Sequence, residues 1–183
     1  MIRPLAARAD AETVLDLYRR AADYLNFESG RVPEPALVEE YFADAPPGGD
    51  PSTSLKLGLF EAGRLMGLMD LAFGYPRAGD AYLGLMLLAR EARGRGLGQL
   101  ALRHVEEAAR ARGATRLLLA VLEMNTRGRA FWEREGFGSP KAYPPAQIGE
   151  RTHVRMRLHK SLSPRPGARE AVPSERDPPG RPE

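Results

Sequence analysis

Apolar positions along this chain fall into two patterns that alternate in sequence. Residues 81–88 and 117–122 are almost continuous apolar runs, which is typical of strands buried on both faces. Between them, apolar residues recur every three or four positions, as on the buried face of an amphipathic helix: Leu97, Ala101, Val105 and Ala108. This stretch predicts a strand, loop, helix, strand unit of the kind that builds parallel sheets.

Shorter patterns extend this unit on both sides. Residues 55–60 and 65–75 are apolar runs joined by Glu61-Ala62-Gly63-Arg64, which is typical of a β-hairpin turn. Asp10 fits the N-cap of an amphipathic helix over residues 11–25. The other expected elements are a strand at 2–6, a helix opened by Pro33 or Pro35, a loop at 44–54 long enough to overhang a site, a helix at 126–135 closed by Gly136, and strands at 137–143 and 152–158.

Composition divides the chain near residue 160. Residues 1–160 carry the apolar patterns and predict one domain, because a chain of 183 residues that is 43% hydrophobic can bury one substantial core. From Ser161 onward the chain is rich in Pro, Arg, Gly, Glu and Ser and holds almost no large apolar residue. Such a segment cannot bury a core, so we expect residues 161–183 to form a disordered tail.

Composition also excludes several kinds of site. The absence of cysteine rules out disulfides, thiolate metal sites and a cysteine nucleophile, and His104, His153 and His159 lack ligand spacing, so no metal is expected. No apolar run is long enough to span a bilayer and the chain start lacks a secretory pattern, which favours a cytoplasmic protein without a membrane partner. The net charge of +3 arises from interspersed charges, so specific nucleic-acid binding is not expected.

The sharpest local signal is Arg93-Gly94-Arg95-Gly96-Leu97-Gly98, at the start of the predicted helix 97–112. The glycines expose the backbone where N–H groups point out of the positive end of that helix. Arginines also gather here, with only Glu91 to oppose Arg90 and the two arginines of the loop. This combination predicts a binding site for a pyrophosphate.

Two separated motifs give residues 1–160 a resemblance to the GNAT (Gcn5-related N-acetyltransferase) superfamily. The family's acetyl-CoA signature is Arg or Gln, any two residues, Gly, any residue, then Gly or Ala, and its fixed places are filled by Arg93, Gly96 and Gly98. The second motif resembles the family's helix and Gly-Phe turn after the fifth strand. It consists of Asn125 followed by Ala130-Phe131-Trp132-Glu133-Arg134-Glu135-Gly136-Phe137.

The resemblance implies both a fold and an activity. The fold is mixed α/β, with a central, mostly antiparallel twisted sheet in which strands 81–88 and 116–122 form a splayed parallel pair flanked by helices. The activity is that of an acetyl-CoA-dependent N-acetyltransferase, which moves an acetyl group directly to a primary amine in a ternary complex. The acceptor implied is a small molecule or a peptide, and a homodimer is compatible with the resemblance.

The resemblance also assigns roles on the donor side. Backbone groups of Met86, Leu87 and Leu88 would hold the pantetheine arm, with the Leu88 N–H facing the thioester oxygen and stabilising the oxyanion. Asn125 would either reach the pantetheine or cap the helix that follows it. The pyrophosphate would be held by the loop N–H groups of Arg93, Gly94, Arg95, Gly96, Leu97 and Gly98.

Trp132 departs from the family pattern and bears on catalysis. Family members often carry there a tyrosine that protonates the leaving CoA thiolate, whereas an indole N–H does not give up its proton at ordinary pH. Either another residue serves as the acid, or none is needed, since a thiol with a pKa near ~8.5 leaves tolerably as a thiolate. The structural alternative is that Trp132 is simply a core aromatic. If the acid is missing, Trp132→Tyr raises turnover at neutral pH.

The acceptor side requires a proton acceptor, because an alkylamine with a pKa near ~10.4 is almost fully charged at pH 7. The candidate carboxylates are Asp70 and Glu61, and Tyr75 and Tyr82 are candidate substrate contacts. Alternation in strand 65–75 places Asp70 among apolar neighbours, which would raise its pKa. The alternative for Asp70 is a structural, hydrogen-bonded carboxylate.

Two other functions are compatible with the sequence. Gly96-Leu97-Gly98-Gln99-Leu100-Ala101 also fits a dinucleotide fingerprint, with Glu123 about 20 residues later, as in an NAD-binding oxidoreductase. Residues 89–94 count against this, because they separate the strand from the fingerprint, and too little chain follows to complete a doubly wound sheet. The second alternative is a non-catalytic acyl-CoA sensor or interaction module that keeps the cofactor groove, and only Trp132 favours it.

Overall fold

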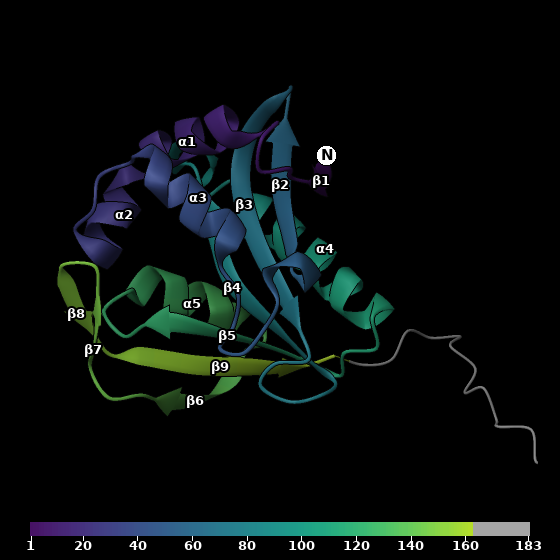
Figure 1. The fold of residues 1–183 in the computed structure, drawn as a ribbon. Coiled ribbons are helices and arrows are strands. Elements are labelled where there is room, and N and C mark those ends of the chain that lie inside the picture. The colour runs from purple at the N-terminus through teal and green to yellow at the C-terminus, as the bar shows by residue number, and fades with distance from the viewer. Residues whose placement is uncertain (163–183) are drawn as a thin grey trace, which may run out of the picture.

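The computed structural model describes residues 1–162 as a twisted sheet with helices on both sides (Figure 1). The seven strands lie in the order β1-β2-β3-β4-β5-β9-β6, and all neighbouring pairs are antiparallel except β4 and β5. In chain order the strands are β1 (Ile2–Pro4), β2 (Leu55–Glu61), β3 (Arg64–Phe73), β4 (Asp80–Leu88), β5 (Arg116–Leu122), β6 (Gly138–Ala142) and β9 (Arg155–Ser161), with β7 (Ala146–Ile148) and β8 (Arg151–His153) in a separate pair.

This architecture confirms the predicted fold class. A mostly antiparallel sheet with one parallel pair, flanked by helices, is the arrangement expected from the resemblance. The dinucleotide-binding alternative requires a doubly wound parallel sheet. Within residues 1–162 only β4 and β5 run parallel, so the sheet does not have that topology.

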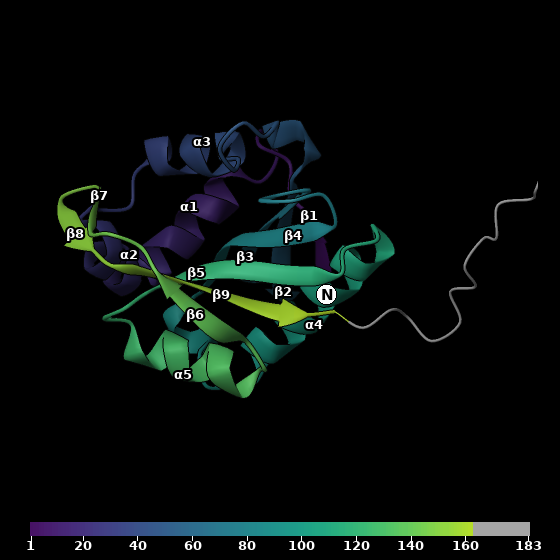
Figure 2. The ribbon, with the colours of Figure 1, turned by 90° about the horizontal axis from the view of Figure 1, so that it is seen from below.

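Helices cover the two faces of the sheet unequally (Figures 1 and 2). On one face lie α1 (Ala11–Arg20), α2 (Ala22–Ser29) and α3 (Pro35–Ala43), and on the other lie α4 (Leu97–Ala111) and α5 (Thr126–Arg134). Each group of helices packs on its own hydrophobic cluster of the sheet. Among the described residues no helix is long and apolar enough to cross a membrane.

The predicted helix over residues 11–25 consists of two helices that meet at Ala21. The N–H of Ala21 reaches the carbonyls of both Leu17 and Tyr18, at 2.9 and 3.1 Å, which ends α1. Asp10 occupies the N-cap position, but its carboxylate accepts from the Ala6 N–H and pairs with Arg3 at 2.6 Å instead of capping α1. Periodicity does not reveal the break, because the buried positions continue through it.

The C-terminal strands also differ from the pattern-based expectation. The predicted strand 152–158 is divided at Val154 into β8 and β9. β9 continues to Ser161, and Leu162 is buried in the core with its N–H bonded to the Thr115 carbonyl at 2.7 Å. Residues 161 and 162 therefore belong to the folded domain, two residues past the boundary expected at residue 160. The rest of the predicted tail, 163–183, lies outside the described residues.

The β4–β5 pair is the feature that positions the site. Residues 80–83 of β4 pair with residues 116–119 of β5, and then the two strands separate. Past this point β4 remains paired with β3 up to Leu88, and β5 remains paired with β9 up to Leu122. Each strand therefore turns one unpaired edge toward the gap between them.

Candidate functional site

A cleft of about 580 Å³ occupies the gap where β4 and β5 separate. Its walls come from β4, β5, the glycine loop with the first turn of α4, the length of α5, and α2. None of the residues in the loop 44–54, which was expected to be long enough to overhang a site, lines this cleft. The lining includes Tyr24, Glu28, Gly84, Met86, Leu87, Leu88, Arg93, Gly94, Gly96, Gly98, Ala120, Asn125, Arg127, Phe131, Trp132 and Arg134.

The unpaired edge of β4 presents backbone groups to this cleft. Beside the end of the strand, the N–H of Ala89 donates to the carbonyl of Met66 on the β3 side, at 3.0 Å. Peptide groups alternate in direction along an antiparallel ladder. The N–H and C=O groups of Leu88 and Met86 therefore point away from β3 and into the cleft, while those of Leu87 point toward β3. The Leu88 carbonyl accepts from Arg93 Nε at 3.2 Å, in agreement with this direction.

The glycine loop leads into the amino end of α4 at one end of the cleft. Gly94 and Gly96 have φ of 76° and 78°, in the left-handed region that glycine adopts without strain. Gly96 is the N-cap of α4, whose first N–H groups have no partner within the helix. A Cβ at Gly98 would lie 3.3 Å from Phe131, so glycine permits the close approach of α4 and α5. The loop thus forms a backbone cradle that a side chain would fill.

The arginines of the loop have side-chain partners. Arg93 lines the cleft and makes a bidentate pair with Asp23 of α2, at 2.6 and 3.0 Å. Arg95 does not line the cleft and pairs with Glu61 across the molecule's surface at 2.9 Å. The side chain of Arg93 therefore ties α2 to the loop and to the Leu88 carbonyl.

Sequence reasoning missed Arg127 and Arg134, two α5 arginines that line the cleft. Arg127 Nη2 lies 4.0 Å from the place where a Cβ on Gly94 would sit, so its guanidinium faces the loop. The predicted parallel pair could have indicated Arg127, because the segments that follow the carboxyl ends of adjacent parallel strands meet at one edge of the sheet. Arg127 follows the second of these strands as the glycine loop follows the first.

Asn125 acts as a helix cap. Its Oδ1 accepts from the Gly128 N–H at 2.9 Å, at the start of α5. A Cβ at Gly128 would lie 2.6 Å from Asn125 Nδ2, so the cap requires glycine there. Of the two roles expected for Asn125, the structure shows the cap, and the residue also lines the cleft.

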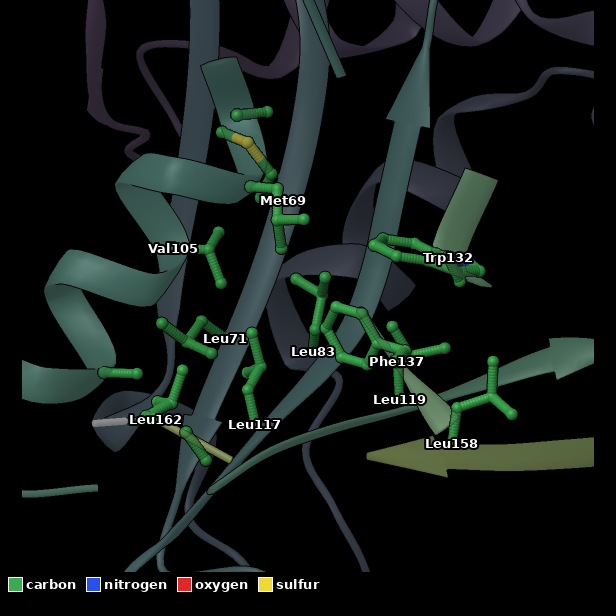
Figure 3. Close-up of a cluster of buried hydrophobic side chains, with 14 of the residues drawn as sticks. Met69, Leu71, Leu83, Val105, Leu117, Leu119, Trp132, Phe137, Leu158 and Leu162 are labelled. Atoms are coloured by element: carbon green, nitrogen blue, oxygen red, sulfur yellow. The ribbon is translucent and has the colours of Figure 1, made fainter. Parts of the chain in front are cut away.

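Trp132 is buried between two aromatic rings. It is 8% exposed, and its ring packs edge-on to Phe131 and Phe137 at centroid distances of 4.8 and 5.2 Å. Figure 3 shows Trp132 and Phe137 within the cluster between the sheet and the helices α4 and α5. Part of Trp132 also lines the cleft. Its position therefore matches a core aromatic at the edge of the site.

The structure does not bring Asp70 or Glu61 to the cleft. Asp70 is 3% exposed and pairs with Lys56 Nζ at 2.8 Å, beneath α3. Burial raises the pKa of Asp70, the direction expected from its apolar neighbours, while Lys56 opposes this shift. Its Oδ1 is buried without a hydrogen-bond partner among the described residues. Asp70 therefore lies behind the cleft wall and does not line it: a Cβ on the lining residue Gly84 would lie 3.3 Å from its Oδ2. Glu61 lies at the β2–β3 turn, paired with Arg95.

The carboxylate that lines the cleft is Glu28, near the end of α2. Its Oε1 accepts from the Tyr24 hydroxyl at 3.2 Å. Burial raises the pKa of Glu28, and the Tyr24 hydroxyl and the nearby His153 oppose the shift. No sequence pattern indicated Glu28, because the helix there was expected to end at about Leu25 and tertiary packing alone places this residue beside β4.

The separated parallel strands and the glycine loop at a helix amino end define an α/β protein with an anion-binding site at one end of an open cleft. Residues 14–137 match the acetyltransferase (GNAT) family, and the chain belongs to this family. The protein is therefore an N-acetyltransferase that uses acetyl-CoA as the donor. A search of curated proteins found no match.

Solved structures share this fold over most of the chain. An acetyltransferase from Thermus thermophilus is 26% identical, with a TM-score of 0.70 over 88% of this chain and 96% of that one. The ribosomal-protein-S18-alanine N-acetyltransferase from Escherichia coli is 17% identical, with a TM-score of 0.66 over 89% and 94%. The PaiA N-acetyltransferase from Thermoplasma acidophilum, solved with coenzyme A, is 20% identical, with a TM-score of 0.59 over 88% and 98%.

Proposed function

We propose that the protein transfers the acetyl group directly from acetyl-CoA to a primary amine, with both substrates bound in the cleft. The observation that carries this proposal is that the unpaired edge of β4 and the bare amino end of α4 line the same cleft. A pantetheine arm between the strands would meet the peptide groups of Met86 and Leu88. The pyrophosphate would meet the backbone of residues 93–98, with Arg127 opposite.

We assign stabilisation of the oxyanion to the Leu88 N–H. Acyl transfer places negative charge on the thioester oxygen, and a fixed N–H donor aimed at that oxygen stabilises the tetrahedral intermediate. β4 is held by β3 along its other edge, through the register that pairs Leu88 with Gly67. The donor is therefore in place before the reaction and costs no reorganisation.

We assign Glu28 as the group that accepts a proton from the acceptor amine. The bound ammonium first gives one proton to Glu28, directly or through one water molecule, and the neutral nitrogen then attacks the thioester carbon. The C–S bond breaks, CoA leaves as a thiolate, and the second proton of the nitrogen passes to solvent. A carboxylate with a raised pKa is a stronger base than an ordinary glutamate, and Glu28 is also negatively charged where a protonated amine would first bind.

The donor half of the proposal is tested by calorimetric titration with acetyl-CoA. Gly96→Glu puts a carboxylate into the cradle and is expected to weaken acetyl-CoA binding at least tenfold by charge repulsion. Gly113→Glu is the matched control, since Gly96 and Gly113 flank the two ends of α4, with φ of 78° and 77°, and neither has an atom within 4 Å of an added Cβ. Equal affinity of both variants for acetyl-CoA would contradict the assignment of the glycine loop as the pyrophosphate-binding site.

The same titration separates the other functions that the sequence left open. NADH and NADPH are not expected to bind, and binding of either in preference to acetyl-CoA would revive the dinucleotide alternative. The transfer half is tested with a panel of amines and a dye that reacts with the CoA thiol. The chain has no cysteine to give a background signal. Tight acetyl-CoA binding without transfer to any amine would identify a non-catalytic sensor.

A further inference from the structure

One face of the sheet is left partly uncovered beside the cleft. Helices α1–α3 lie over β2–β4, and within residues 1–162 Figures 1 and 2 show no helix over the same face of β5, β9 and β6. The opposite face of these strands is covered, because Leu119 and Leu158 pack into the cluster under α4 and α5. Lys160 also points that way, with its Nζ 2.6 Å from Glu106 of α4. The alternate side chains of β5 and β9 therefore project onto the uncovered face.

Register fixes which side chains share this face. Ala120 of β5 is the partner of Arg157 on β9, and Arg157 is in turn the partner of Lys141 on β6. His159 lies two residues along β9, opposite Leu118. Side chains of partnered residues project to the same side of a sheet. Basic side chains of β6 and β9 thus share one face with Arg77 of the β3–β4 loop, and we call this set the basic surface: Arg77, Lys141, Arg155, Arg157 and His159.

The basic surface is hollowed and carries unbalanced positive charge. A pocket of about 230 Å³ is lined by Arg77, Arg116, Lys141, Arg157 and His159, together with Pro76, Leu118 and Ser139, and none of these eight residues is acidic. Arg116 is neutralised by a bidentate pair with Asp80, at 2.8 and 2.8 Å. Within residues 1–162, Arg77, Lys141 and Arg157 form no ion pair.

Tyrosines border the same surface. Lys141 Nζ and Arg157 Cζ lie 5.6 and 5.3 Å from the ring centre of Tyr143. Tyr75 and Tyr82 pack edge to face at 5.4 Å. Burial raises the pKa of the Tyr82 hydroxyl, and Arg155 and Arg157 are close enough to oppose this shift. Phenol rings hold the guanidinium and ammonium groups in place while leaving their N–H donors available.

The basic surface is continuous with the acetyl-CoA cleft. Ala120 is exposed and lines the cleft, while its partner Arg157 lines the basic pocket. Leu118, in the floor of that pocket, lies two residues from Ala120, or about 7 Å along β5, and β6 lies roughly 10 Å from β5 across the sheet. An α-amino acid carries its amine and carboxylate on one carbon and cannot bridge this span. An extended peptide covers it with about three residues.

We propose that the basic surface binds acidic side chains of a peptide acceptor and that the enzyme therefore prefers peptides with acidic residues about three positions from the reacting amine. This inference rests on the proposed transfer in the cleft, because it takes the amine to lie between β4, β5 and Glu28. The acceptor is then bound with its positive amine toward Glu28 and its negative side chains toward Lys141 and Arg157.

The test compares two octapeptides that have a free α-amine and no lysine, one with Asp and Glu at positions 3 to 5 and one with Asn and Gln there. We expect kcat/KM about tenfold higher for the acidic peptide at low salt, with the preference falling at 0.5 M salt as screening increases. In Lys141→Gln/Arg157→Gln the ratio of the two kcat/KM values approaches one. The matched control is Arg19→Gln/Arg103→Gln, which removes two exposed charges on α1 and α4 and keeps the ratio.

Anisotropy of the labelled acidic peptide in the presence of CoA gives a second readout that does not need turnover. Equal transfer to both peptides at every salt concentration would contradict the proposed role of the basic surface and support the transfer function. Salt-sensitive binding that the Lys141/Arg157 variant loses, without any transfer, would support the surface and contradict the transfer function. If the acidic peptide neither binds nor is preferred over the neutral one, the inference is wrong.

Discussion

At the scale of single residues, Glu28 and Asp70 show how differently two carboxylates with raised pKa values can be used. Burial raises both pKa values. Glu28 lines the cleft and its carboxylate accepts a hydrogen bond from the Tyr24 hydroxyl, whereas Asp70 is paired with Lys56 behind the cleft wall. A raised pKa therefore marks a candidate base only where the group is also accessible to a substrate.

Glu28→Gln tests the proton acceptor. A base must be ionised, so kcat/KM of the wild type is expected to rise with pH through the raised pKa of Glu28 and then level. For the variant, kcat/KM is expected to lose this rise with pH and to fall by about 10² to 10⁴ at neutral pH. Because the folded-state pKa is raised, the ionised Glu28 costs stability above that pKa, so the variant is not expected to unfold more easily at pH 7.

Two variants complete this experiment. Glu28→Asp retains a carboxylate and is expected to recover part of the rate and the pH-dependent limb. Glu39→Gln changes an exposed glutamate on α3 and should leave the profile as it is. A Glu28→Gln enzyme with the wild-type profile would show that another group or solvent takes the proton.

Asp70→Asn is predicted to act on stability and not on the reaction. It leaves the Lys56 ammonium buried beneath α3 without its charge partner, which typically costs about 3–5 kcal/mol. Urea unfolding measures this loss, and Lys56→Met/Asp70→Leu is expected to recover most of it by replacing both charges with apolar groups. A marked fall in kcat for folded Asp70→Asn enzyme across pH 6 to 9 would return Asp70 to the mechanism.

Trp132→Tyr tests whether the missing phenol limits the rate. Trp132 lines the cleft, so a phenol there could protonate the leaving thiolate, and we expect a higher kcat at neutral pH with saturating acetyl-CoA. Trp132→Phe is the matched control, because it reduces the aromatic packing on Phe131 and Phe137 in a similar way without adding a hydroxyl. No difference between the two variants would mean that a missing phenol at position 132 does not limit the rate.

At the scale of elements, β4 carries the clearest prediction. Its peptide groups alternate, so the amides of Met86 and Leu88 face the cleft while that of Leu87 faces β3. Hydrogen exchange of Met86 and Leu88 is expected to be fast in the free protein and to slow when acetyl-CoA binds, whereas the Leu87 amide is protected in both states. Unchanged exchange at Met86 and Leu88 would contradict a pantetheine arm along this edge.

The elements also show which local signals are reliable. The helices at Pro35 and Leu97 and the hairpin at Ala62-Gly63 were predictable, because proline, glycine and apolar period act within a few residues. The break at Ala21 and the division at Val154 were not, because the apolar period continues across the first and strand alternation across the second. Both are decided by what the neighbouring residues pack against.

At the scale of the whole molecule, the site exists because one parallel pair interrupts an antiparallel sheet. β4 and β5 keep their outer partners, β3 and β9, and separate from each other after four paired residues. The glycine loop and the start of α5 follow these two strands, so they meet at the open end. The basic surface arises from the same topology, because β9 and β6 extend the sheet past the last of the helices α1–α3 (Figure 1).

The strand-loop-helix-strand unit, the glycine cradle and the family could be predicted from the chain alone, because these depend on the order and spacing of neighbouring residues. The resemblance also indicated Met86, Leu88 and Asn125 as candidates. The folded structure was needed to show that Asp70 is paired with Lys56, that Glu28 and Arg127 reach the cleft, and that basic residues of β6 and β9 form one surface. These depend on contacts between residues far apart in the chain, which periodicity and local propensity do not record.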